Sequence, residues 1–196
     1  MIFDKKIKAL IFDCDGTLVD SGKIHLKAWK ETIDGFGCIY DESFLILRNG
    51  LPSERIISDY NKHFGVDINA ADFAQKKNKN MEQFLKQVKT IPEISSILLE
   101  NFQKYKICVL SGGNAVDVTM SLKVNNLLDK CDLIVTADDG FPTKDNPEIY
   151  HQVAQSLSTS IDCCHFFEDG FFAIKAAKAA GMQVTDVNEF LSGIVK

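Results

Sequence analysis

Five short apolar runs stand out along the chain, and each has the length of one strand. They are rich in β-branched and aromatic residues, and each ends in a polar or glycine-containing segment. Continuous apolar runs of this kind are typical of strands buried on both faces of a parallel sheet. The predicted strands cover residues 7–12, 107–110, 133–136, 163–167 and 183–187.

Helical patterns lie between the later runs. Apolar residues recur at helical spacing from Ile94 to Phe102, after Pro92, a residue that suits the first turn of a helix. Residues 172–180 are rich in alanine and are followed by Gly181, the kind of residue at which helices end. The alternation of strand and helix predicts right-handed βαβ units, and hence an α/β fold with a Rossmann-like parallel sheet and helices on both faces.

Residues 21–88 differ, because they carry helical patterns without a convincing strand. One helix is expected around Trp29, a second that opens at Pro52-Ser53-Glu54 and runs toward Gly65, and a third over residues 72–88. We therefore expect a small α-helical cap domain inserted into the α/β core. The predicted core domain comprises residues 1–20 and 89–196, and the predicted cap domain comprises residues 21–88, with hinges near residues 20–22 and 89–92.

Composition excludes several classes of protein. The chain has 196 residues, 45% hydrophobic and 25% charged, with a formal charge of -5, which is ordinary for a globular protein. No run approaches the roughly 18 apolar residues of a membrane span, and the N-terminus does not resemble a signal peptide, so we expect a soluble, cytoplasmic protein without a membrane partner. Mild acidity, with only a short basic segment at residues 76–79, argues against a nucleic-acid partner. Six cysteines without a C-x-x-C pair suggest reduced, mostly buried thiols.

Polar residues follow the first four predicted strands, where the carboxyl ends of a parallel sheet meet at one edge. Several carboxylates at one edge would repel each other unless a divalent cation held them, and oxygen ligands suit Mg²⁺. A serine hydroxyl, glycine N–H groups and a lysine are suitable partners for phosphate oxygens. The residues concerned are Asp13, Asp15, Ser111, Gly112, Lys144, Glu168 and Asp169.

The two aspartates after the first strand indicate the chemistry. An aspartate beside Mg²⁺ and a lysine can attack a phosphate monoester and form an aspartyl-phosphate, and Asp13 fits that role. The departing alkoxide needs a proton, which a second carboxyl group could donate before it activates water. Asp15 fits this second role.

These residues resemble the motifs of a known family. Residues 13–21, which read Asp-Cys-Asp-Gly-Thr-Leu-Val-Asp-Ser, resemble the first motif of the haloacid dehalogenase superfamily. Ser111, Lys144 and the pair Glu168 and Asp169 follow in the order of its other three motifs. The helical insertion resembles the cap of the β-phosphoglucomutase-like subfamily, which includes fructose-1-phosphate and 6-phosphogluconate phosphatases. The similarity in the cap is carried by residues 25–29 and 48–50.

The resemblance implies a Mg²⁺-dependent phosphatase that acts on a small phosphorylated metabolite, a sugar or sugar-acid phosphate, and we expect a monomer or a weak dimer. It implies that Asp13 is the nucleophile and that Asp15 is the acid/base. The implied metal ligands are Asp13, Asp15 through its backbone carbonyl, Asp169, and Glu168 directly or through water. The implied phosphate ligands are Ser111, Gly112 and Lys144, and the implied substrate contacts from the cap are His25, Asn49, Gly50 and Lys77.

Alternatives remain beside this interpretation. A mutase that returns the phosphoryl group to another hydroxyl would use the same core, and a phosphate-binding module without turnover would keep the same fold; a dehalogenase fits less well. In the cap, Trp29 favours core packing. His25 could be a partly buried residue without a role in binding, and Lys77 could belong to a solvated helix face. The family usually places proline directly after the third-motif lysine, whereas Asp145 and Asn146 follow it here, and this change could loosen the grip on phosphate.

Overall fold

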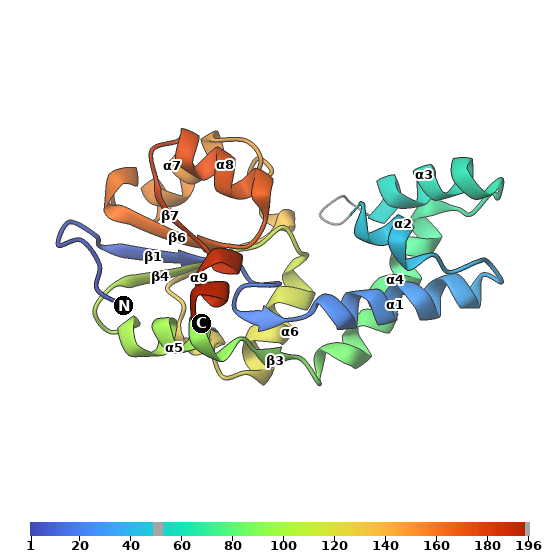
Figure 1. Cartoon of the computed structure of the whole chain (residues 1–196), viewed down its shortest axis with the longest axis horizontal. Helices are drawn as coiled ribbons and strands as arrows, with labels where there is room; N and C mark the ends of the chain where they lie inside the picture. The colour runs from blue at the N-terminus through green and yellow to red at the C-terminus, as the bar shows by residue number, and fades with distance from the viewer. Residues whose placement is uncertain (49–52, 195–196) are drawn as a thin grey trace. The chain divides into compact units, whose positions relative to one another are not determined.

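The computed structural model describes residues 1–48 and 53–194, which form two compact units (Figure 1). The first unit contains residues 1–20 and 88–196, and the second contains residues 21–87. Within the described residues, no helix is both long enough and apolar enough to cross a membrane. All six cysteines are free thiols, and three of them, Cys14, Cys108 and Cys164, are buried, which is fewer than expected.

A parallel sheet of five strands forms the centre of the first unit, in the order β5-β4-β1-β6-β7. Both neighbours of β1 run parallel to it, with Ala9 opposite Lys106 on one side and Cys164 on the other. The predicted α/β class is confirmed, and each predicted strand lies within two residues of an observed one. The strands are β1 (Ala9–Phe12), β4 (Lys106–Leu110), β5 (Leu133–Val135), β6 (Cys164–Glu168) and β7 (Gln183–Asp186).

Helices cover both faces of this sheet, with α5 and α6 on one side and α7 and α8 on the other (Figure 1). Alternate residues of β1 point to opposite faces, and Ala9 and Ile11 join a buried cluster with Val153 of α7 and Ala177 of α8. The sheet is therefore buried on both faces. The helices are α5 (Pro92–Asn101), α6 (Ala115–Val124), α7 (Glu148–Ser156), α8 (Phe171–Ala179) and α9 (Val187–Ile194), with single 3-10 turns at Leu128–Lys130, Ala137–Asp139 and Ile161–Cys163.

The second unit is helical and has its own core. Trp29 is buried against Phe73, with ring centroids 5.2 Å apart, so its predicted packing role is confirmed. One short helix, α2, was not predicted; it begins where the Asp41 side chain accepts a hydrogen bond from the backbone of Phe44, and it is too short to show a helical period. The helices are α1 (Gly22–Gly35), α2 (Glu42–Ile46), α3 (Ser53–Phe64) and α4 (Ala70–Leu85).

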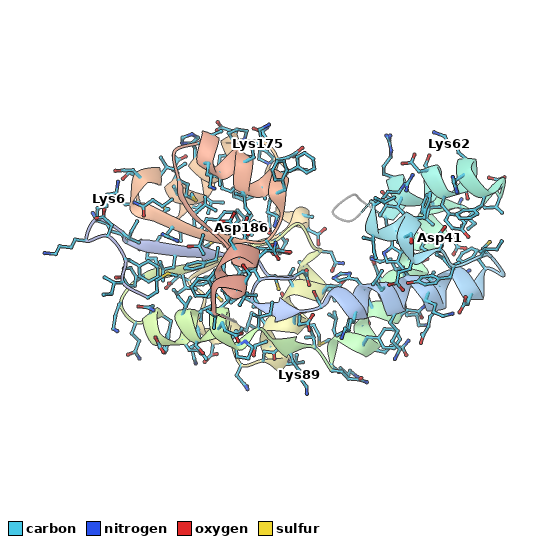
Figure 2. All side chains as sticks on the ribbon, in the orientation of Figure 1. Lys6, Asp41, Lys62, Lys89, Lys175 and Asp186 are labelled. Atoms are coloured by element: carbon cyan, nitrogen blue, oxygen red, sulfur yellow. The ribbon has the colours of Figure 1, made fainter. Side chains whose placement is uncertain are left out.

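The two chain segments that border the second unit are more ordered than predicted. Strands β2 (Val19–Asp20) and β3 (Lys89–Thr90) pair antiparallel, with Asp20 opposite Lys89, which is labelled in Figure 2. Each strand has only two residues, so neither shows the alternation that identifies a strand in a sequence. The hinges predicted near residues 20–22 and 89–92 thus begin inside a backbone-paired ladder.

Candidate active site

The central strand ends in a tight loop that carries the first two aspartates. Asp13 is 3% exposed, and its backbone N–H donates to the carbonyl of Phe167 on β6. Gly16 has a φ of +82°, and its N–H donates to the carbonyl of Val19. A Cβ at Gly16 would lie 2.5 Å from Oδ2 of Asp169. Glycine is thus required here by backbone conformation and by the close approach of a second carboxylate.

Lys144 joins two carboxylates that come from neighbouring strands. Its Nζ lies 2.6 Å from Oδ1 of Asp13 and 2.7 Å from Oε2 of Glu168. The other carboxylate oxygen of Glu168 accepts hydrogen bonds from the backbone N–H groups of Asp169 and Gly170, at 3.2 and 2.9 Å. Both oxygens of Glu168 are therefore occupied, and this orients Lys144 toward Asp13.

The residues that follow Lys144 do not disturb this ion pair. The hydroxyl of Thr143 donates to Oδ1 of Asp145 at 2.6 Å, and Asp145 is exposed. Asn146 accepts from the backbone of Glu148 at the start of α7. The extra carboxylate at Asp145 therefore bonds to Thr143, and the amine of Lys144 keeps its contacts with Asp13 and Glu168.

Burial and mutual repulsion change the ionisation of the cluster. Burial, with a further contribution from Glu168, raises the pKa of Asp13 to about 8 even though Lys144 opposes the shift. Burial also raises the pKa of Glu168 and of Asp169. Burial disfavours the charged form of Lys144, but the carboxylates of Asp13 and Glu168 outweigh it and raise its pKa. The lysine is therefore a permanent cation, while the carboxylates gain from a further positive charge.

Three of these side chains can meet a divalent cation. Asp13, Glu168 and Asp169 each offer a carboxylate oxygen, and these atoms lie within 4.8 Å of one another. The carboxylate of Asp169 is 3.4 Å from the hydroxyl of Thr17, and its backbone carbonyl accepts from the side-chain amide of Asn188 at 2.9 Å. An all-oxygen donor set with raised carboxyl pKa values fits Mg²⁺, which suits such ligands and would replace protons on the cluster.

The loop after β4 provides donors beside the same carboxylates. Ser111 is buried, and its Oγ accepts from the N–H of Gly113 at 3.0 Å, so its own proton can be donated to a ligand. A Cβ at Gly113 would lie 3.6 Å from Oδ2 of Asp15, and one at Gly112 would lie 3.9 Å from Cε of Lys144. The core residues predicted from strand ends therefore form one cluster.

The residues predicted from the second unit have a different outcome. His25 lies half-buried on α1, and Lys77 on α4 is 7% exposed, with Nζ 5.6 Å from the ring centroid of Trp29. The idea that Lys77 belongs to a solvated helix face is wrong, because the residue is buried. Asn49 and Gly50 lie outside the described residues. Contact between any of these four residues and a substrate stays a prediction.

Three residues without a predicted role contact the cluster. They are Thr17 and Asn188, which contact Asp169, and Tyr150, whose hydroxyl is 2.7 Å from the carbonyl of Lys144. Tyr150 left a usable signal, because a buried tyrosine normally needs a partner for its hydroxyl and this one lies six residues after Lys144. Asn188 left none, because its contact depends on how the last helix follows β7.

The shifted carboxyl groups predict that pH changes the stability of the metal-free protein. The pKa of Asp13 rises from 3.8 to about 8 on folding, so between these values the native state binds more protons than the unfolded chain. The free energy of unfolding should therefore fall as pH rises through this window. Thermal unfolding in a chelator, from about pH 5 to about pH 8, measures this slope.

The Asp13→Asn variant is the control, because it should show a shallower slope than the wild type. Added Mg²⁺ should raise Tm more at about pH 8 than at about pH 6, since metal ligands must be deprotonated. A variant slope equal to that of the wild type would mean that Asp13 does not take up the extra proton.

Known proteins resemble this chain over most of its length, including the residues of the cluster. The sequence profile of the haloacid dehalogenase-like hydrolases matches residues 10–187. Fructose-1-phosphate phosphatase YqaB of Escherichia coli (strain K12) is 29% identical over 184 residues, which cover 93% of this chain and 97% of that protein. Beta-phosphoglucomutase of Bacillus subtilis (strain 168) is 26% identical, over 93% of this chain and 84% of that protein. The fold matches that of CbbY from Rhodobacter sphaeroides in complex with phosphate, with a TM-score of 0.80, 22% identity, and coverage of 91% and 84%.

Proposed function

The chain belongs to the haloacid dehalogenase-like hydrolases, and from this premise we propose that it is a Mg²⁺-dependent phosphatase of small sugar or sugar-acid phosphates that works through an aspartyl-phosphate. Similar proteins include several that are named as phosphatases, which confirms the predicted enzyme class. The observation that carries the mechanism is the position of Lys144, between Asp13 and Glu168 and beside a third carboxylate. A carboxylate held in this way can act as a nucleophile toward an anionic ester.

Each residue of the cluster has its own role in the proposed reaction. Asp13 attacks phosphorus and forms the P–O bond of the aspartyl-phosphate, while Asp15 donates a proton to the departing alkoxide. Asp15 then removes a proton from the water that releases phosphate from Asp13. Ser111, Gly112 and Lys144 hold the phosphoryl oxygens. The attraction between the Lys144 charge and these oxygens is stronger in a site that excludes water.

Mg²⁺ would be held by Asp13, Asp169 and the backbone carbonyl of Asp15, where it would neutralise the charge shared by these carboxylates and the substrate phosphate. Glu168 would take part directly or through a water molecule, and its two oxygens also accept from Lys144 and from two backbone amides. These contacts also fix Lys144 in place.

Specificity is proposed to come from residues 21–88, acting as the cap domain of the α/β core formed by residues 1–20 and 89–196. The residues of this domain that we expect to contact the substrate are His25, Asn49, Gly50 and Lys77. Lysine is rarely buried unless its charge is paired, and Lys77 is 7% exposed. It is therefore the residue of this group whose replacement should be most informative.

Replacing Lys77 by alanine should change the choice of substrate more than the chemical step. We expect KM for the preferred sugar phosphate to rise about tenfold, the size of a lost charged hydrogen bond, while p-nitrophenyl phosphate still turns over. Lys76→Ala is the matched control, because its side chain is 57% exposed and pairs with Asp72. Melting temperatures of both variants separate lost packing from lost recognition. An unchanged substrate profile in Lys77→Ala would remove this residue from the pocket.

Phosphate release from a panel of sugar phosphates, with and without Mg²⁺, tests the proposed function. The panel includes fructose 1-phosphate, 6-phosphogluconate and β-glucose 1-phosphate. Metal-dependent release is the expected result, and it ranks the substrates. The similarity to a phosphoglucomutase favours one alternative, which conversion of β-glucose 1-phosphate to glucose 6-phosphate without release would support. Phosphate binding without either activity would instead indicate a phosphate-binding module.

A further inference from the structure

The side chain of Tyr150 connects the loop that carries Lys144 with helix α8. Tyr150 is on α7 and is fully buried. Its hydroxyl is 2.7 Å from the backbone carbonyl of Lys144 and 2.9 Å from the backbone carbonyl of Ala173 in α8. Both partners are acceptors, so the single phenolic proton is shared between them. The hydroxyl thus holds the loop that carries Lys144 against the first half of α8.

The two connected segments lie next to the two partners of one ion pair, Lys144 and Glu168. Helix α8 begins at Phe171, two residues after Asp169. Lys144 contacts Glu168 through its amine, and the Tyr150 hydroxyl fixes the other end of the same residue, its carbonyl. Lys144 is therefore positioned at both ends relative to the strand end that carries the acidic pair.

The rest of this loop is held by local contacts, among them a hydrogen bond of 2.9 Å from the N–H of Asn146 to the carbonyl of Thr143. Between residues 143 and 147, Lys144 is the one residue that is not exposed. Asp145 and Asn146 bond to Thr143 and Glu148, which are exposed themselves. A loop with an exposed backbone gains few contacts from packing and opens readily. Its register relative to Asp13 then depends on the contacts of Lys144.

We propose that Tyr150 is a positioning residue for the reaction: its hydroxyl sets the place of Lys144 and, through it, the grip on the phosphoryl group during transfer. This inference rests on the proposed function, because it assigns the affected step to the phosphate held by Lys144. The aromatic ring itself contributes packing, against Phe166 at 5.5 Å between centroids. Tyr150→Phe keeps that packing and removes only the hydroxyl.

The test compares Tyr150→Phe with the wild-type chain by steady-state kinetics and by inhibition with orthovanadate, a mimic of the transferring phosphoryl group. We expect kcat to fall about three- to tenfold, the equivalent of one hydrogen bond, and orthovanadate inhibition to weaken by a similar factor. KM should change less than kcat, and Mg²⁺ affinity should stay unchanged, because the contacts of Asp13 and Asp169 with a metal do not pass through Tyr150. A purely structural role would lower Tm and leave kcat and inhibition as they are.

Tyr60→Phe is the matched control. Tyr60 is also fully buried, and its hydroxyl donates to the backbone carbonyl of Ile39 in the second unit. Both variants should lose a similar amount of thermal stability, and only Tyr150→Phe should turn over p-nitrophenyl phosphate more slowly than the wild type. Equal kcat values in the two variants would overturn the proposal.

The failure of the proposed function can be told apart from the failure of this inference. If the wild-type chain releases phosphate from no ester, the proposed function fails. Binding of orthovanadate and of inorganic phosphate, measured by calorimetry on the wild type and on Tyr150→Phe, then still tests the inference. Weaker binding in the variant supports the positioning role, and equal binding overturns it.

Discussion

Asp13→Asn is expected to abolish turnover without loss of the fold. Asparagine has the same shape and still accepts a hydrogen bond from Lys144, but its amide does not attack phosphorus to form an acyl-phosphate. Removal of a nucleophile that acts in concert with other groups typically costs on the order of 10⁴-fold or more in kcat. Phosphate release from the preferred substrate, before and after the change, measures this loss.

The stability of this variant gives a second, independent readout. Burial raises the pKa of Asp13 to about 8, so its charge opposes folding of the metal-free chain at alkaline pH. We therefore expect metal-free Asp13→Asn to be at least as stable as the wild type at about pH 8, and to gain less from Mg²⁺. Low activity combined with a lower Tm would instead indicate a damaged fold.

Asp145→Asn is the matched control for the same chemical change in the neighbouring loop. Asp145 is exposed and bonds to Thr143, so its neutralisation should leave kcat within about twofold, as is usual for surface changes away from such contacts. Normal turnover by Asp13→Asn would contradict the covalent mechanism. A large loss in Asp145→Asn would show that the departure after Lys144 affects catalysis after all.

The strands and the core of the site could be predicted from the sequence because both depend on local patterns. An apolar run such as residues 107–110 identifies a buried strand by itself, and the carboxyl ends of parallel strands meet whatever the intervening helices are. Asp13, Ser111, Lys144 and Glu168 could therefore be placed together before any distance was known. Their order along the chain, after successive strands, was sufficient.

The missed features depend on contacts between distant parts of the chain. Strands β2 and β3 have two residues each and exist only because Asp20 meets Lys89. Lys77 has the sequence context of an exposed helix face, and only the packing of Trp29 against α4 reveals that it is buried. The hydroxyl of Tyr150 forms hydrogen bonds with two backbone carbonyls from separate segments. Neither composition nor periodicity carries information of this kind.

Lys144→Met is expected to have the largest combined effect on stability and activity. Methionine keeps most of the aliphatic length of lysine but removes the charge that lies between Asp13 and Glu168 at 2.6 and 2.7 Å. Loss of one partner from a buried ion pair typically costs about 3–5 kcal/mol, because the remaining charges stay buried without compensation. The phosphoryl group would lose its cation at the same time, so turnover should fall by at least about 10²-fold.

The pH dependence of this loss identifies its cause. Without the lysine, the two carboxylates repel each other more and take up protons more readily, so the penalty should be largest at about pH 8 and small at about pH 5. Urea unfolding of the metal-free variant and wild type at both values measures the difference. Lys175→Met, a change on the exposed side of α8 (Figure 2), controls for the loss of a lysine. A penalty for Lys144→Met that is equal at both pH values would mean that packing, and not the charge between Asp13 and Glu168, makes this lysine important.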